Sequence, residues 1–162
     1  MFKINDVIVY KNRLVCTIKD IGVPDFITTG QIYYKLQPVN QRESLLYVKY
    51  ENCRAIRYPL PRQDAKQYME SFSDMESIYD KSDRYREKDL TEALDSSDYI
   101  KQLRYYKGIA LEKTRRSRSG KSLPVSDDKN MKKLENLLYP EFSVSLGIPE
   151  EEVKQKLADA CN

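Results

Sequence analysis

Hydrophobic and polar residues alternate with a period of two through much of the first 60 residues. Such alternation is typical of strands with one buried face, and it predicts five of them. The predicted strands cover residues 7–10, 15–21, 31–37, 45–50 and 54–58. Segments containing Gly, Pro and Asn separate them, as turns require. Because a closed sheet leaves no exposed edge strand, the pattern favours a small closed or nearly closed barrel.

The period of the apolar residues lengthens to about 3.6 after Pro59-Leu60-Pro61, which is typical of amphipathic helices. We therefore place a domain boundary here, with a β domain at residues 1–60 and a helical domain at residues 61–162. Tyr68 and Phe72 belong to a first short predicted helix, and a second runs from Ile78 to Leu94. The predicted fold class is α+β, with the small β-barrel followed by a compact all-α domain of four to five helices.

A third helix is predicted from an apolar stripe with steps of four, three and four residues. The stripe consists of Tyr99, Leu103, Tyr106 and Ala110. It leaves the basic side chains of the same helix to face solvent or a ligand, and these are Lys101, Arg104 and Lys107. The segment that follows, residues 114–121, has too few apolar residues to pack, so we predict a mobile basic arm.

Two further helices are predicted in the last 40 residues. Ser126 is the expected N-cap of the first, with Asp127 and Asp128 near the positive end of its dipole. Pro140 is expected to kink or interrupt that helix, and Gly147 to end it. The final helix follows Pro149, and its predicted inward-facing residues are Val153 and Leu157.

The composition argues against several functional classes. The chain has no histidine, and its three cysteines, Cys16, Cys53 and Cys161, are far apart. Ser-His and Cys-His dyads and the commonest metal ligand are therefore absent, so we expect neither an enzyme nor a bound metal or cofactor. No apolar run is long enough to span a bilayer, and the first residues do not resemble a secretory signal. We expect a cytoplasmic protein with no membrane partner.

Charge is distributed unevenly along the chain. Residues 99–133 contain 11 basic and 3 acidic residues, whereas the whole chain has a net charge of only +3. Such a cluster is suited to binding phosphates, because each neutralised phosphate releases condensed counterions. The alternative is a solvated helix face beside a basic loop.

Two tyrosines stand among basic residues just before this region. Tyr79 and Tyr85 alternate with Lys81, Arg84, Arg86 and Lys88. Aromatic rings in such a setting can stack on bases or wedge between them while the cations hold phosphates. The alternative is that Tyr85 is buried and that the acidic residues interspersed here repel DNA.

Taken together, the residues resemble the CarD family, also called CdnL-like and related to the polymerase-interaction module of transcription-repair coupling factors. The amino-terminal part of the likeness consists of Phe2-Lys3-Ile4, Asp6, Val9-Tyr10, residues 15–21, residues 33–39, Leu46-Tyr47-Val48, Glu51-Asn52 and Ile56-Arg57. The carboxy-terminal part consists of Arg86, Leu94, Ser96, Asp98, Leu123, Ser126, Asp128, Lys129, Leu137-Leu138-Tyr139, Glu141-Phe142 and Leu146-Gly147-Ile148. The likeness covers nearly the whole chain.

The resemblance implies a Tudor-like or SH3-like β domain that docks on the β-subunit lobe of bacterial RNA polymerase. The expected polymerase-binding residues are Tyr47, Lys49 and Arg57. It also implies a helical domain that contacts promoter DNA at the upstream edge of the melted bubble and modulates open-complex stability. The expected DNA-binding residues are Tyr79, Arg84, Tyr85, Arg86, Lys88, Lys101, Arg104 and Lys129. The implied activity is not enzymatic.

The chain departs from the family pattern at three points. It has no tryptophan to serve as the wedge of well-known members, and Tyr79 is the first candidate to replace it, with Tyr85 the second. Leu14 and Lys49 stand where the family has a glycine and a proline. A protein-interaction adaptor that docks through its β domain without touching DNA is therefore the alternative function. We expect a monomer, with a domain-swapped dimer as the alternative.

Overall fold

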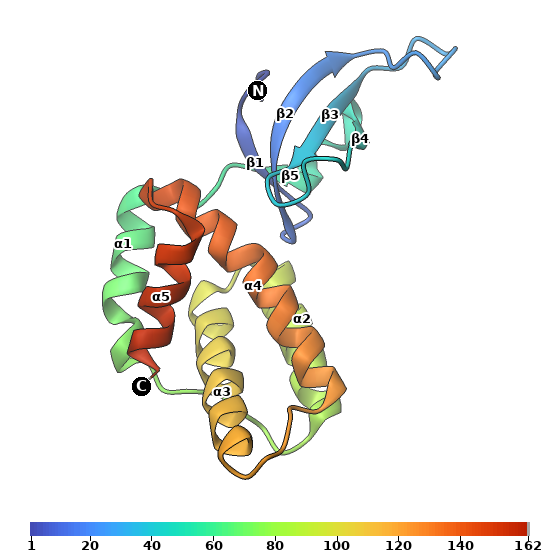
Figure 1. Ribbon diagram of the computed structural model, residues 1–162. Helices are drawn as coiled ribbons and strands as arrows, with labels where there is room; N and C mark the ends of the chain where they lie inside the picture. The colour runs from blue at the N-terminus through green and yellow to red at the C-terminus, as the bar shows by residue number, and fades with distance from the viewer. Residues whose placement is uncertain (162) are drawn as a thin grey trace. The chain divides into compact units, whose positions relative to one another are not determined.

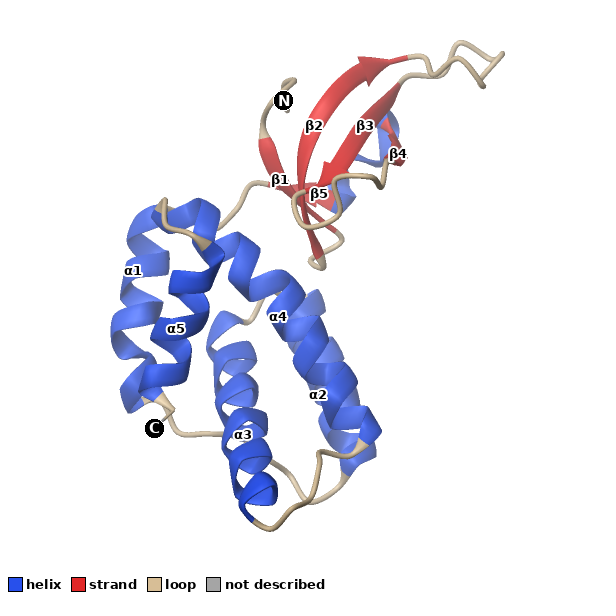
Figure 2. Ribbon diagram, in the orientation of Figure 1, coloured by secondary structure: helices blue, strands red, loops and turns tan. Residues whose placement is uncertain are grey.

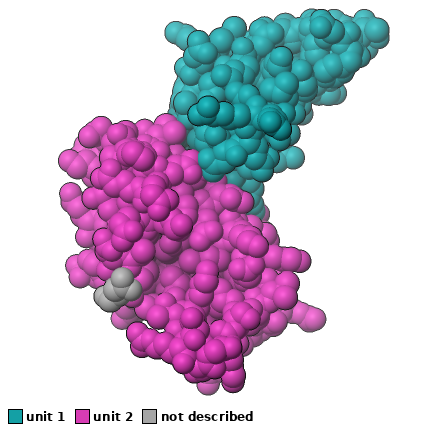
Figure 3. Space-filling view, in the orientation of Figure 1, with its two compact units in different colours: residues 1–60 teal, residues 61–162 magenta. Residues whose placement is uncertain are grey.

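The computed structural model describes residues 1–161. The chain divides into two compact units, residues 1–60 and residues from Pro61 onward (Figure 3). The first unit is an antiparallel sheet and the second is helical, so the fold is α+β as predicted (Figure 2). The division falls at the Pro59-Leu60-Pro61 segment. No helix within the described residues is long and apolar enough to cross a membrane.

The sheet of the first unit has five strands in the order β4-β3-β2-β1-β5 (Figure 1). They are β1 (Val7–Tyr10), β2 (Leu14–Gly22), β3 (Tyr33–Pro38), β4 (Leu46–Lys49) and β5 (Ile56–Arg57). Residues 11–13 join β1 to β2, and Lys11 and Asn12 among them have φ of 50° and 51°. Two successive positive φ values match the twist of the flanking strands in a tight hairpin.

The register of the strands places one set of apolar side chains on a common inner face. Ile8 pairs with Cys16, and Ile18 pairs with Leu36, and all four are fully buried. A bulge between Ile18 and Asp20 in β2 shifts the alternation by one residue. Because of that shift, Ile21 also packs against the inner core although it lies three residues after Ile18.

The prediction of a closed barrel is not confirmed, because the sheet is open. Strands β4 and β5 are the two edges, and the described pairings include none between them. The predicted strand at residues 54–58 is reduced to Ile56–Arg57, since residues before it form the 3₁₀ helix η1 (Tyr50–Ala55). This short helix carries the chain from one edge strand directly to the other.

The second unit contains five α-helices within residues 61–161 and a short 3₁₀ helix. They are α1 (Arg62–Ser71), η2 (Phe72–Asp74), α2 (Asp83–Asp95), α3 (Tyr99–Arg118), α4 (Val125–Leu146) and α5 (Glu150–Ala160). Large buried side chains from these elements form its core, including Phe72, Leu90, Leu103, Leu134 and Phe142. The predicted inward-facing residues of the last helix, Val153 and Leu157, are fully buried.

Helices α3 and α4 differ in several details from those predicted. Helix α4 begins at Val125 after Pro124, so Ser126 lies inside it and is not its N-cap. Pro140 does not interrupt α4, and this buried proline lies inside a helix that continues to Leu146. Gly147 does end the helix, with φ of 68°, as is common at helix C-termini. Residues 114–118 of the predicted mobile arm belong to α3.

Candidate functional site

A segment without regular structure, residues 75–82, leads into α2, and we call it the strap. The prediction that Ile78 and Tyr79 lie in a helix is wrong, because both belong to the strap. The strap lies directly on the backbone of α3, where the Ile78 N–H donates to the Arg104 carbonyl oxygen at 3.0 Å. A β-carbon on Gly108 would overlap the Ile78 carbonyl. The absence of a side chain at Gly108 therefore allows the strap to approach.

Basic side chains of α3 donate hydrogen bonds to backbone carbonyl groups of the strap and of η2, which precedes it. Lys107 Nζ donates to the Ser73 and Met75 carbonyls, both at 2.8 Å. Arg104 Nε donates to the Glu76 carbonyl at 2.8 Å. These bonds satisfy backbone acceptors that no helix or sheet would otherwise pair. Arg104 and Lys107, which were predicted to face solvent or a ligand, therefore already bind carbonyl groups of the helical unit.

Lys101, the third member of that predicted stripe, is also engaged. Its Nζ lies 2.9 Å from Asp89 Oδ1 on α2, and the hydrogen bond to Asp89 raises the pKa of Lys101. Burial alone would raise the pKa of Asp89, but hydrogen bonds from Tyr105 and Lys101 outweigh it and lower that pKa. The structure thus places Lys101 and Arg104 in contacts within the unit, while both remain partly exposed.

Arg86 is buried, with 4% of its side chain exposed. Its Nε and Nη2 donate to the two carboxylate oxygens of Asp127 at 3.0 and 2.8 Å, and Nη1 donates to the Asp80 carbonyl. The guanidinium also lies 4.2 Å from the centre of the Tyr79 ring. Each of its three nitrogens thus already donates to a protein oxygen, and almost none of the side chain is exposed to a ligand.

Tyr79 is held by the same carboxylate. Its hydroxyl donates to Asp127 Oδ2 at 2.5 Å, and burial, followed by this hydrogen bond, raises the pKa of Tyr79 to about 12. The Arg86 guanidinium covers one face of the Tyr79 ring, and the residue is half-buried. Tyr79, the first candidate for the stacking residue, is thus engaged by two residues of the helical unit.

Tyr85 lies in the first turn of α2, with 54% of its surface exposed. Ser82 caps the helix by accepting from the Tyr85 N–H at 3.3 Å. Arg84 and Lys88, one residue before and three after, are also exposed. Side chains three residues apart on a helix are neighbours. Tyr85 and Lys88 therefore share a face of α2.

The ion pair between Arg86 and Asp127 fastens the start of α2 to the start of α4. Lys129, an exposed residue of α4, lies near this junction in the chain. The role of Asp127 was missed from the sequence, where it was assigned only to the helix dipole. The spacing does contain a signal, because Asp127 precedes the buried Met131 by four residues and so falls on the same buried stripe.

The predicted polymerase-binding residues occupy two edges of the sheet. Tyr47 and Lys49 of β4 pair with Lys35 and Tyr33 of β3, so all four side chains share the outer face. Arg57 lies on β5, the opposite edge strand, and its Nε donates to Asn12 Oδ1 at 2.6 Å. The register therefore brings Tyr47 and Lys49 together but leaves Arg57 at the other side of the sheet.

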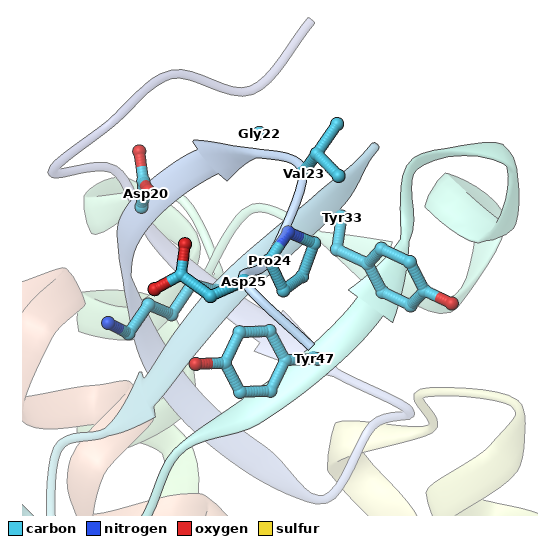
Figure 4. Close-up of a pocket in the computed structure, with 8 residues that line it drawn as sticks. Asp20, Gly22, Val23, Pro24, Asp25, Tyr33 and Tyr47 are labelled. Atoms are coloured by element: carbon cyan, nitrogen blue, oxygen red, sulfur yellow. The ribbon is translucent and has the colours of Figure 1, made fainter. Parts of the chain in front are cut away.

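Two hollows lie beside Tyr47. The larger, of about 500 Å³, extends along β4 and η1 and includes Lys49 and Arg54. The smaller, of about 100 Å³, lies between β4 and the start of the loop after β2 (Figure 4). Phe26 from that loop contacts the Tyr47 ring edge-on, at 4.9 Å between ring centres, and is 63% exposed. Sequence reasoning did not single out Phe26, which lies in a loop with no regular pattern.

No metal-binding cluster was found among residues 1–161. The cysteines are free, with Cys16 buried and Cys53 exposed. No group of three or more His, Cys, Asp or Glu side chains in this part of the chain is arranged to hold a metal ion. The two candidate binding surfaces of the described residues are those around Tyr85 and Tyr47.

Comparison with known proteins adds no assignment. No protein-family model matches the chain, and no curated protein matches it.

Proposed function

We propose that the protein is a non-enzymatic transcription regulator of the CarD type. In this proposal the β unit docks on the β-subunit lobe of bacterial RNA polymerase, and the helical unit contacts promoter DNA at the upstream edge of the bubble. In this proposal the protein acts in the cytoplasm, as a monomer, and needs no cofactor. The chain would change the lifetime of the open complex and catalyse no reaction.

The observation that carries the proposal is the exposure of Tyr85. It is the exposed tyrosine of the helical unit within residues 61–161, where the other tyrosines are buried or half-buried. An aromatic ring that is not needed for the core, with Arg84 and Lys88 near it, is suited to stacking on an unpaired base while the cations hold phosphates. Tyr85 therefore replaces Tyr79 as the proposed wedge.

The β unit supports polymerase docking through the open edge of its sheet. Strand β4 is an edge strand that carries Tyr47 and Lys49 on the outer face. Edge strands have unpaired backbone groups that another protein's strand can pair with. The strand order, the bulge in β2 and the 3₁₀ turn joining β4 to β5 support the proposal of a Tudor-like unit. Arg57 would then support the β1–β2 turn through Asn12 and would not contact polymerase itself.

The proposed action is a shift of populations. A protein that contacts the opened duplex better than the closed duplex stabilises the open complex by the difference in binding free energy. About 1.4 kcal/mol of such a difference changes the ratio of the two states tenfold. Stacking of one base on an aromatic side chain contributes about 1–3 kcal/mol, which is sufficient for an effect of this size.

The test is the open-complex lifetime on a purified promoter, measured with bacterial polymerase and the full chain. We expect Tyr85→Ala to shorten the lifetime about tenfold relative to the unaltered chain, and Tyr85→Trp to retain or lengthen it. Ile100→Ala, at a half-exposed apolar residue of α3, is the matched control. An open complex whose lifetime is the same with and without the unaltered chain would refute the proposal.

One observation favours the alternative of a protein-interaction adaptor. Arg86, Lys101 and Arg104, all expected to bind DNA, instead make contacts within the helical unit, which reduces the cations available for phosphates. Salt distinguishes the two functions. DNA contact through several phosphates weakens steeply as ionic strength rises, whereas a protein contact made by apolar anchors changes little.

A further inference from the structure

A basic hollow lies where α3 ends and α4 begins. It has a volume of about 450 Å³ and lies within the helical unit. Its lining consists of Lys113, Ser117, Lys121, Ser122, Leu123, Val125 and Asp128. Two lysines and two serine hydroxyls give it hydrogen-bond donors for an anion. Both lysines belong to the basic cluster at residues 99–133, but neither is among the individual residues expected to bind DNA.

The carboxylates of Glu112 and Asp128 form ion pairs with cations other than these two lysines. Glu112 accepts from Arg115 Nη2 at 2.6 Å and from Arg116 Nε at 2.8 Å, and the hydrogen bond from Arg115 is the main cause that lowers the pKa of Glu112 to about 2. Asp128 lies 3.0 Å from Lys132 Nζ. The ion pairs of the described residues do not include Lys113 or Lys121.

The backbone of the hollow forms a hydrogen-bonded turn, within the segment that was predicted to be a mobile arm. After α3, Gly120 adopts φ of 69°, a left-handed conformation common just beyond a helix end. The Lys121 N–H donates to the Arg116 carbonyl at 2.9 Å, and the Gly120 N–H donates to the Ser117 carbonyl at 3.0 Å. Lys121 therefore extends from a defined turn, and less conformational entropy is lost when it binds.

The hollow and the Tyr85 surface lie at the same end of the helical unit. Figure 1 shows the start of α2, the end of α3 and the start of α4 together at the lower end of this unit. The ion pair between Arg86 and Asp127 joins the first of these to the third. A duplex that reaches Tyr85 would therefore run beside a second group of cations from different elements.

We propose that the basic hollow is a second, sequence-independent phosphate site for the DNA that Tyr85 contacts. This inference rests on the proposed function and extends it, since Lys113 and Lys121 would hold the intact duplex beside the melted region. The site has no aromatic residue in its lining, and its cations exceed its carboxylates. Its two lysines are suited to pairing with phosphates of a DNA backbone, whatever the base sequence.

The experiment measures the affinity of the full chain for a fluorescently labelled duplex over a range of KCl concentrations. Each phosphate contact contributes about 0.9 to the slope of log affinity against log salt. We expect the double variant Lys113→Ala/Lys121→Ala to reduce the magnitude of the slope by about 2. The matched control is Lys154→Ala/Lys156→Ala, at two exposed lysines of α5, which should leave the slope unchanged.

Two outcomes would overturn the inference. The first is an unchanged slope for the double variant while the duplex still binds, and the second is a polyglutamate peptide that displaces the duplex as well as unlabelled duplex does. Failure of the proposed function is read separately, from the Tyr85→Ala open-complex lifetime. The duplex could bind with the expected salt slopes while Tyr85→Ala leaves the open-complex lifetime unchanged. That result would support the phosphate site at the hollow and refute the role of Tyr85 as the wedge.

Discussion

Arg86 and Asp127 form a buried ion pair that joins the first turn of α2 to the first turn of α4. The shortest distance between their side chains is 2.8 Å, and their exposed fractions are 4% and 0%. The same carboxylate accepts from the Tyr79 hydroxyl. One carboxylate thus fixes the strap and two helices, and the orientation of Tyr85 depends on it indirectly.

Replacing Arg86 is expected to destabilise the protein strongly. Arg86→Ala leaves Asp127 buried without its cation, and such a loss costs about 3–5 kcal/mol. We expect the free energy of unfolding, measured by urea denaturation, to fall by that amount. Arg84→Ala, at the exposed neighbour, should change it by less than about 0.5 kcal/mol. Similar stability for both variants would contradict the structural role of Arg86.

Gly108→Ala should displace the strap. The added β-carbon would overlap the Ile78 carbonyl, and relieving that overlap requires the strap to move away from α3. Overpacking of this kind costs about 1–3 kcal/mol. We expect a lower thermal midpoint and faster amide hydrogen exchange at Ile78, whose N–H would lose the Arg104 carbonyl. Slow exchange at Ile78 in the variant would show that the strap does not depend on this approach.

Lowering the pH should destabilise the C-terminal end of α3, because Glu112 becomes protonated there. Its pKa lies at about 2 in the folded chain, below the ordinary 4.5, so its stabilising contribution is present above about pH 4.5 and is lost as the pH falls toward 2. Glu112→Gln should therefore show a smaller loss of stability over this range, measured by thermal unfolding. Asp89, whose pKa is also lowered, acts in the same direction and remains in the variant. Parallel acid profiles would contradict the role of Glu112.

The two edges of the β unit should respond differently to substitution. Lys49→Glu reverses a charge on the outer face of β4 and should weaken retention of the polymerase β lobe by the full chain about tenfold or more, without changing stability. Arg57→Ala removes the hydrogen bond to Asn12 and should lower stability by about 1 kcal/mol. Binding assays with thermal unfolding separate the two effects. Equal losses of binding at unchanged stability would place both residues in the interface.

Periodicity predicted most of the regular elements but not the irregular segments between them. Strand β1 and the buried positions Val153 and Leu157 follow from the spacing of apolar residues alone. The strap could not be predicted this way, because its conformation depends on Gly108, thirty residues away from Ile78 in the chain. Closure of the sheet is not confirmed either, because β4 and β5 remain its two edges.

The sequence indicated which basic and aromatic residues gather in the helical unit, but not what each of them contacts. Arg86, Lys101 and Arg104 are basic, as a phosphate site requires, yet each is engaged by a carboxylate or carbonyl that folding brings from another element. Sequence alone does not distinguish a cation needed by the backbone from one available to a ligand. Tyr79 and Tyr85 differ for the same reason, since only Tyr79 meets Asp127.

The unpaired edge of β4 also has a consequence for the chain in the absence of a partner. A strand edge that accepts another protein's strand can equally accept the same strand from a second copy, which begins aggregation. Lys49 at the end of this edge opposes such edge-to-edge pairing, because a charged lysine on an edge strand disfavours addition of a further strand. Hydrophobic replacement of this one lysine should make the concentrated protein precipitate.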